Sequence, residues 1–182
     1  YYLEQAGLGQ ALRPNEDGYS AFRNFVAKYA SCEKAHQLFY DYVKFILTRT
    51  NRYTKKKYKD DPAIMSWQIG NEPRAFSKEQ LPAFEKWLGE ASKLIRSLDK
   101  NHLISIGSEG KWGCEGELNC WERICADKNV DYCNIHLWPY NWSWARKDHL
   151  QEDLGISCQN TKEYIDEHLE VCGRIRKPLV ME

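Results

Sequence analysis

Short apolar runs alternate with long amphipathic stretches over most of this 182-residue chain. The apolar runs have the length of strands and cover residues 63–69, 103–106, 130–137 and 179–181. Strands that alternate with helices along a chain form parallel sheets with right-handed crossovers. The alternation therefore predicts an α/β fold with about four parallel strands and intervening helices.

Helical spacing of apolar residues predicts helices over residues 31–48, over residues 77–98 and after Asn160. Ser31 is expected to cap the first helix. The pairs Ser77 with Gln80 and Asn160 with Glu163 have the spacing of a capping box. Residues 1–30 and the Cys-, Trp- and Glu-rich stretch after Gly110 are predicted to be loops.

The chain shows one composition throughout, without a linker or a low-complexity tract, so residues 1–182 are predicted to be one domain or part of one. A closed (β/α)₈ barrel usually takes about 250 residues. Four strands cannot close such a barrel. The sequence is therefore expected to be a fragment, incomplete at both ends.

The charge and hydropathy of the chain argue against nucleic acid and membranes as its partners. The chain has 26 basic and 26 acidic residues, which argues against nucleic acid as the main partner. No stretch is long and apolar enough to predict a membrane span. The only basic cluster, residues 55–59, is expected to be a solvated loop.

The cysteines leave two interpretations open. There are seven, but no C-x-x-C pair has the spacing of a structural zinc site, so no metal is expected. A disulfide between Cys114 and Cys120 would close a short loop and imply an oxidising compartment. Buried free thiols are the alternative, notably for Cys133 within a predicted strand.

The strand at 63–69 runs into the polar sequence Asn71-Glu72-Pro73-Arg74. Enzymes built on parallel strands carry their chemistry at the C-terminal ends of those strands. Pro73 has no N–H to donate, so the ladder should stop there, and it favours an extended conformation for Glu72. Glu72 is a candidate general acid; the alternative is a solvated loop carboxylate.

The next two strands also end in polar side chains, Glu109 and His136. A single histidine is more often structural than catalytic, but the ends of neighbouring parallel strands lie at one edge of a sheet. We therefore expect Glu109 and His136 to lie near Glu72.

Residues 61–74 resemble the acid/base strand of family 5 glycoside hydrolases, specifically the endo-β-1,4-mannanases. The resemblance implies a (β/α)₈ TIM barrel and a retaining mechanism in which Glu72 protonates the leaving glycosidic oxygen. It implies that Asn71 binds the sugar 2-hydroxyl and that Arg74 holds sugar on the leaving-group side.

The resemblance extends best from about residue 22 to the end of the chain, and implies the part of the barrel from the third helix to the seventh strand. By the same resemblance, Glu109 is a substrate-binding carboxylate and His136 positions the catalytic carboxylates. Trp138 stands where many relatives carry Tyr, which leaves a stacking role but removes the phenolic hydrogen bond to the nucleophile.

The nucleophile of the family falls five places after the proline that starts the seventh strand, here Pro178. This count gives the position after Glu182. Because side chains alternate across a strand, Glu182 is expected to face away from the catalytic cleft, although its assignment as the nucleophile stays open. The 182-residue chain alone is therefore predicted to be inactive.

The resemblance thus implies an endo-acting retaining hydrolase that cleaves β-1,4-mannosidic bonds in mannan or manno-oligosaccharides, needs no cofactor, and is secreted, periplasmic or on the cell surface. Two alternatives remain. One is a family 5 enzyme acting on β-glucan or xylan. The other is a non-catalytic polysaccharide-binding protein on a degenerate barrel.

Overall fold

The structure is a computed structural model that describes all 182 residues. Its strands are β1 (Ser66–Gln68), β2 (Leu103–Ser105), β3 (Cys133–Ile135) and β4 (Leu179–Met181). Its α-helices are α1 (Tyr2–Gln5), α2 (Pro14–Asp17), α3 (Tyr19–Val26), α4 (Glu33–Thr48), α5 (Leu81–Leu98), α6 (Leu118–Ala126) and α7 (Leu150–Ile175). The predicted alternation of strand and helix is confirmed from α4 onwards.

The four strands form two parallel pairs instead of one continuous ladder. β1 pairs with β2, and β3 pairs with β4. Side-chain bonds join β2 to β3: Asn134 Oδ1 accepts hydrogen bonds from Ser105 Oγ at 2.7 Å and from the Gly107 N–H at 3.0 Å. The single sheet expected from the sequence is thus divided into two pairs, and one backbone hydrogen bond, from the Asp131 N–H to the Ile104 carbonyl at 2.8 Å, also joins the two parts.

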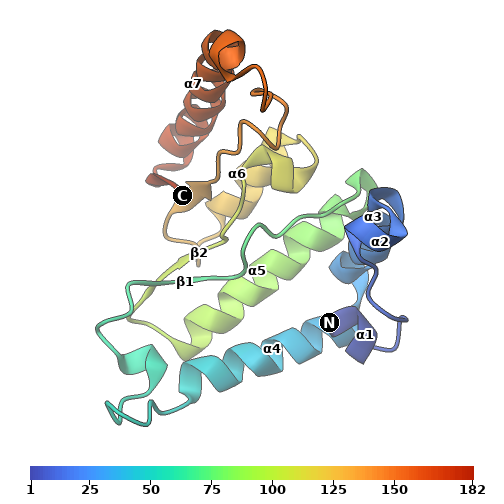
Figure 1. Ribbon diagram of the computed structural model, residues 1–182. Coiled ribbons are helices and arrows are strands. Elements are labelled where there is room, and N and C mark those ends of the chain that lie inside the picture. Colours follow the sequence, from blue (N-terminus) through green and yellow to red (C-terminus); the bar gives the residue numbers. More distant parts are fainter.

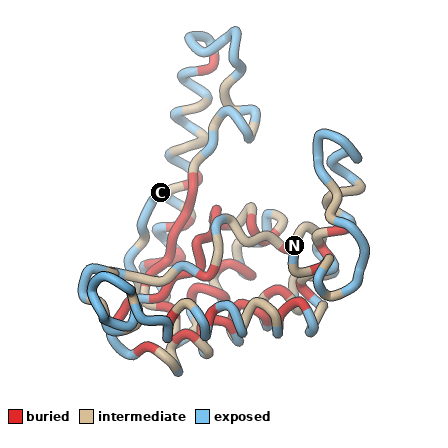
Figure 2. Tube along the Cα trace, turned by 60° about the horizontal axis from the view of Figure 1, so that its bottom comes forward, coloured by how far each residue is buried: buried red, intermediate tan, exposed pale blue.

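Helices α4 and α5 lie side by side along one side of β1 and β2, while α6 and α7 accompany the C-terminal pair of strands (Figure 1). The buried residues follow the inner sides of these helices and the strands (Figure 2). In α5 the buried stripe consists of Phe84, Trp87, Leu88, Ala91, Ser92 and Ile95. These contacts hold the strands so that their C-terminal ends lie together.

The two predicted loops contain helices. Residues 1–30 form α1, α2 and α3 and enter a short 3₁₀ helix, and the stretch after Gly110 contains α6. In α6, Trp121 and Ile124 recur at helical spacing and are buried, together with two cysteines. The prediction of a loop is wrong for this stretch, because its Cys and Trp side chains bury apolar surface and form the inner face of a helix.

The predicted caps are also wrong in detail. Helix α4 begins at Glu33, and its N-cap residue is Cys32 instead of Ser31. Ser77 is the N-cap residue of a 3₁₀ turn that ends at Gln80 and precedes α5, and Ser77 makes no cap hydrogen bond. Asn160 and Glu163 lie inside α7, which begins at Leu150. The early turns of α7 are largely exposed, so they lack the apolar stripe that would have revealed them.

All seven cysteines are free thiols in the structure, and five of them are buried. No helix combines the length and the apolar composition needed to cross a bilayer. No group of three or more His, Cys, Asp or Glu side chains is arranged to hold a metal ion.

Candidate active site

Glu72 lies just beyond β1 in a left-handed backbone conformation, with a φ of 51°. Its backbone N–H donates a 2.8 Å hydrogen bond to the carbonyl of Gly107, which follows β2. The extended conformation expected before Pro73 is therefore wrong, because Glu72 adopts a positive φ in the bend that follows β1. Such strain persists where the surrounding structure fixes the residue, and it is common at functional sites.

The carboxylate of Glu72 is held through one of its oxygens. Trp138 Nε1 donates a 2.8 Å hydrogen bond to Glu72 Oε1, and His136 Nδ1 lies 2.8 Å from the same atom. Both partners come from the segment that follows β3. The Glu72 side chain keeps 30% exposure, whereas His136 keeps 7%. The carboxylate is thus fixed on its inner side and open to an incoming ligand on the other.

Arg74 and Glu109 form an ion pair beside Glu72. Arg74 Nη2 lies 2.7 Å from Glu109 Oε2, and the Glu109 side chain is only 8% exposed. Burial raises the pKa of Glu109, the nearby negative charge of Glu72 raises it further, and Arg74 opposes both effects. The guanidinium of Arg74 also lies over the ring of Phe76, 5.9 Å from its centroid.

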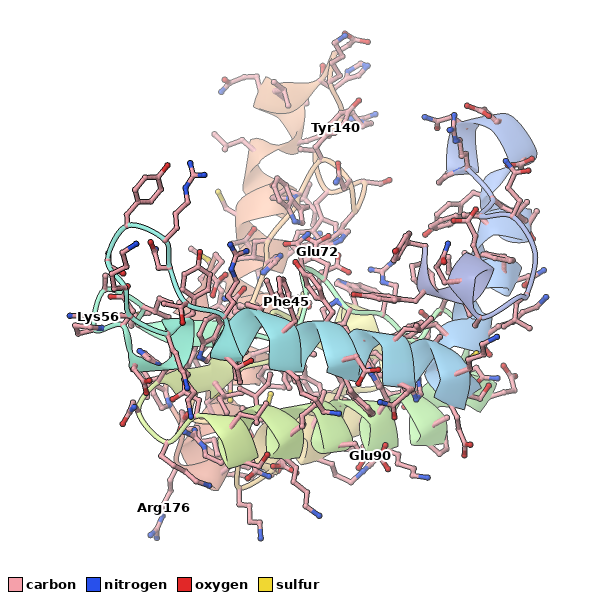
Figure 3. The ribbon with its side chains drawn as sticks, turned by 90° about the horizontal axis from the view of Figure 1, so that it is seen from below. Phe45, Lys56, Glu72, Glu90, Tyr140 and Arg176 are labelled. Atoms are coloured by element: carbon pink, nitrogen blue, oxygen red, sulfur yellow. The ribbon has the colours of Figure 1, made fainter.

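Asn71, Glu72 and Arg74 line one end of a hollow of about 430 Å³. The rest of its lining is largely aromatic and includes Tyr2, Phe22 and Phe76. Glu72 lies towards the centre of the molecule, whereas Lys56 and Arg176 lie at its edges (Figure 3). A larger hollow of about 640 Å³ between α5 and α6 contains none of the strand-end residues.

Glu182 lies on the same side of the strands as His136. The register of β3 and β4 pairs Asn134 with Val180, so His136 and Glu182, each two residues further on, share a face. Glu182 Oε2 is 3.9 Å from His136 Nε2, and both its carboxylate oxygens accept hydrogen bonds from Gln68 Nε2, at 2.6 and 2.8 Å. The expectation that Glu182 faces away is therefore wrong.

The imidazole of His136 separates the two carboxylates, with Glu72 at Nδ1 and Glu182 at Nε2. Acid and nucleophile of a retaining glycosidase lie about 5–5.5 Å apart, with the scissile bond between them. A histidine ring in that space is incompatible with direct attack by Glu182 on a bond that Glu72 protonates. This geometry argues against Glu182 as the nucleophile.

The structure therefore brings together Glu72, Arg74, Glu109, His136 and Trp138, and places Asn71 beside them with an exposed side chain. Sequence reasoning missed the residues that hold the strand ends in place: Gln68, Gly107 and Asn134. For Gly107 a signal existed, since a glycine directly before a polar strand end often marks a close backbone approach. A Cβ there would lie 1.9 Å from the Gly70 carbonyl oxygen.

Known proteins of similar sequence and structure exist for most of the chain. Residues 4–182 match a family model described as GH family 5 β-mannosidase-like. Mannan endo-1,4-β-mannosidase 1 of Arabidopsis thaliana is 31% identical over 195 aligned positions, which cover 99% of this chain and 43% of the relative. A putative mannan endo-1,4-β-mannosidase 4 of the same plant is 38% identical and covers 95% of this chain and 42% of the relative.

Solved structures show the same similarity. A family 5 mannosidase from Rhizomucor miehei superimposes on all of this chain with a TM-score of 0.85 at 28% identity, and 42% of that chain is covered. An endo-1,4-β-mannanase from the same fungus superimposes with a TM-score of 0.72 at 25% identity, and 49% of it is covered. The chain thus spans less than half the length of these relatives.

Proposed function

The chain belongs to glycoside hydrolase family 5, in its β-mannosidase-like group, and on that basis we propose that the protein cleaves β-1,4-mannosidic bonds inside mannans with retention of configuration. One observation carries the proposal for this chain: a carboxylate at the end of a barrel strand, held at one oxygen by Trp138 and His136 and open at the other. An acid/base residue needs a carboxyl group that is fixed in position and has one oxygen free to exchange a proton with the substrate.

In the proposed reaction Glu72 gives its proton to the glycosidic oxygen as that oxygen leaves the anomeric carbon. A second carboxylate attacks the same carbon and forms a glycosyl-enzyme ester. Glu72, now ionised, takes a proton from water, and the resulting hydroxide displaces the ester. We assign the nucleophile to the residue after Glu182 in the full-length protein, because the family resemblance counts the nucleophile five places after Pro178.

The remaining site residues bind and position in this proposal. Asn71 and Glu109 bind hydroxyl groups of the sugar, and Arg74 holds the sugar on the leaving-group side. His136 fixes the catalytic carboxylate from its buried side. No step needs a metal ion or an organic cofactor, because carboxylates carry both proton transfer and nucleophilic attack.

The test is the activity of the full-length protein on mannan, with Glu72→Gln and Glu85→Gln compared side by side. Glu85 is a helix carboxylate paired with Arg123, outside the strand ends. We expect Glu72→Gln to lose at least about 100-fold in kcat/KM and Glu85→Gln to keep its activity. Full activity of Glu72→Gln would refute the assignment. The 182-residue chain alone is expected to be inactive.

An exo-acting β-mannosidase is the second candidate, because the matched family model is described as β-mannosidase-like and one superimposed structure is a mannosidase. Product analysis separates the two: an endo-acting enzyme lowers the viscosity of mannan early and releases oligosaccharides, whereas an exo-acting enzyme releases mannose. Cellulose and xylan in the same assay test the two other substrate classes named above.

A secreted, periplasmic or cell-surface location is part of the proposal, because a hydrolase of polymeric mannan must reach a polysaccharide that does not enter cells. Fractionation of the source cells, with activity measured in medium, wall and lysate, tests this location. Activity confined to the lysate would contradict it.

A further inference from the structure

The two oxygens of the Glu72 carboxyl group differ in their hydrogen-bonding partners. Oε1 receives the indole N–H of Trp138 at 2.8 Å and contacts His136 Nδ1 at 2.8 Å. Oε2 contacts no hydrogen-bonding group of the protein. The two oxygens of one carboxyl group are therefore unequal, with Oε1 occupied and Oε2 free.

The backbone alone does not set the direction of this side chain. Glu72 is anchored through its N–H to Gly107, in a turn with positive φ, and the side chain extends from that turn with 30% exposure. Its carboxyl group makes two hydrogen-bond contacts, both at Oε1, and these orient it beside a hollow whose lining is largely apolar.

Trp138 is itself held without being buried. The residue is 48% exposed, and its carbonyl accepts a 3.0 Å hydrogen bond from the Trp142 N–H in the turn that follows. An exposed indole with its N–H directed at a carboxylate differs from a core tryptophan. Trp112, for comparison, has its indole nitrogen buried and without a partner.

We propose that Trp138 is a positioning residue for Glu72: its indole N–H fixes Oε1 and leaves Oε2 as the oxygen that carries the proton to the glycosidic oxygen. This inference rests on the proposed function of Glu72. It differs from the stacking role implied by resemblance, in which the face of the ring contacts a sugar and the N–H has no part.

The chemistry follows from the two oxygens. When the Oε2–H bond breaks, its proton goes to the glycosidic oxygen, which takes the electron pair of the breaking C–O bond while the nucleophile bonds to the anomeric carbon. Negative charge then spreads over the Glu72 carboxylate. The N–H of Trp138 becomes a charge-assisted donor to Oε1 and stabilises that charge.

The experiment compares two classes of substrate in the full-length protein: aryl manno-oligosides with a good leaving group, such as dinitrophenolate, and unactivated mannan. Departure of dinitrophenolate needs no proton, whereas cleavage of mannan does. Trp138→Phe keeps an aromatic face but removes the N–H. We expect it to lose roughly 10- to 100-fold in kcat/KM on mannan and little in kcat/KM on the dinitrophenyl substrate. This constant reports formation of the ester and excludes its later hydrolysis, in which Glu72 acts as base.

The ratio of the two rates within one preparation does not depend on the fraction of folded enzyme, so a partly unfolded variant still gives an answer. Trp112→Phe is the matched control, because it removes an indole N–H that has no partner; its ratio should equal that of the wild type. Equal losses on both substrates by Trp138→Phe would indicate stacking and overturn the proposal, as would an unchanged ratio.

If Glu72→Gln itself keeps full activity on mannan, the proposed function fails; if only Trp138→Phe behaves as wild type, the positioning role alone fails.

Discussion

The ion pair between Arg74 and Glu109 makes a prediction about stability that is independent of catalysis. The two side chains are 23% and 8% exposed, and their charged atoms are 2.7 Å apart. Replacing Arg74 by Met keeps much of the stem but leaves the Glu109 charge buried without its partner. Breaking a buried pair in this way costs about 3–5 kcal/mol, and because Arg74 is a quarter exposed we expect the lower end, about 3 kcal/mol.

The pH dependence has a definite sign. The pKa of Glu109 is already raised in the folded state, and removing Arg74 raises it further. A carboxyl group with a raised folded pKa binds more protons folded than unfolded, so stability falls as pH rises from the unfolded value of about 4.3. The deficit of Arg74→Met should therefore be small near about pH 4.5 and complete near about pH 7.5.

Urea unfolding of the full-length protein, followed by tryptophan fluorescence at the two pH values, measures this difference. The double variant Arg74→Met/Glu109→Gln should recover most of the lost free energy, since no charge is left unpaired. Lys78→Met serves as control: its pair with Glu117 is exposed, and its loss should not be measurable. A double variant as unstable as Arg74→Met would refute the reasoning.

Two further predictions concern packing and protonation. Gly107→Ala should abolish folding or lower stability by several kcal/mol, because the φ of Gly107 is 77° and an added Cβ would lie 1.9 Å from the Gly70 carbonyl oxygen. An added Cβ at Gly155 in α7 meets nothing within 4 Å, so Gly155→Ala should stabilise the protein by about 0.5–1 kcal/mol. Thermal unfolding measures both effects. Burial lowers the pKa of His168 to about 4. Between about pH 6.5 and about pH 4 the unfolded state therefore binds a proton that the folded state does not bind, and stability should fall by on the order of 3 kcal/mol as the pH is lowered through this range. In His168→Gln this acid-dependent loss, measured by urea unfolding across that range, should be much smaller; an equal loss would assign it to other groups.

Much of the site could be predicted because each of its polar residues follows an apolar run. His136 directly follows β3, whereas Glu72 and Glu109 lie four residues beyond β1 and β2, and parallel strands bring the segments after their C-terminal ends together. The resemblance then supplied the roles. The sequence could not show which atoms come into contact. Loop geometry and strand register decide that Trp138 donates a hydrogen bond to Glu72 and that Glu182 lies near His136.

The helices could be predicted where apolar residues recur at helical spacing, and they were missed elsewhere. Helices α4 and α5 have buried stripes and were predicted close to their observed ends. Helix α6 has its buried residues at helical spacing, but it is short and half of them are cysteines, whereas the first turns of α7 are exposed and show no apolar stripe. The side-chain link between β2 and β3 depends on Asn134, a single buried amide whose partners lie on another strand.

The left-handed conformation of Glu72 leads to a last prediction. A non-glycine residue with a positive φ is strained, and this strain should lower the free energy of unfolding. Glu72→Ala and Glu72→Gly both remove the carboxylate and its contacts, so their difference reports the backbone alone. At a φ of 51° glycine should be more stable than alanine by about 1 kcal/mol. At Lys93, an exposed position inside α5, the order should reverse, with glycine less stable than alanine by about 1 kcal/mol. Urea unfolding of the four variants in the full-length protein tests this; the same order at both positions would show that Glu72 stores no strain.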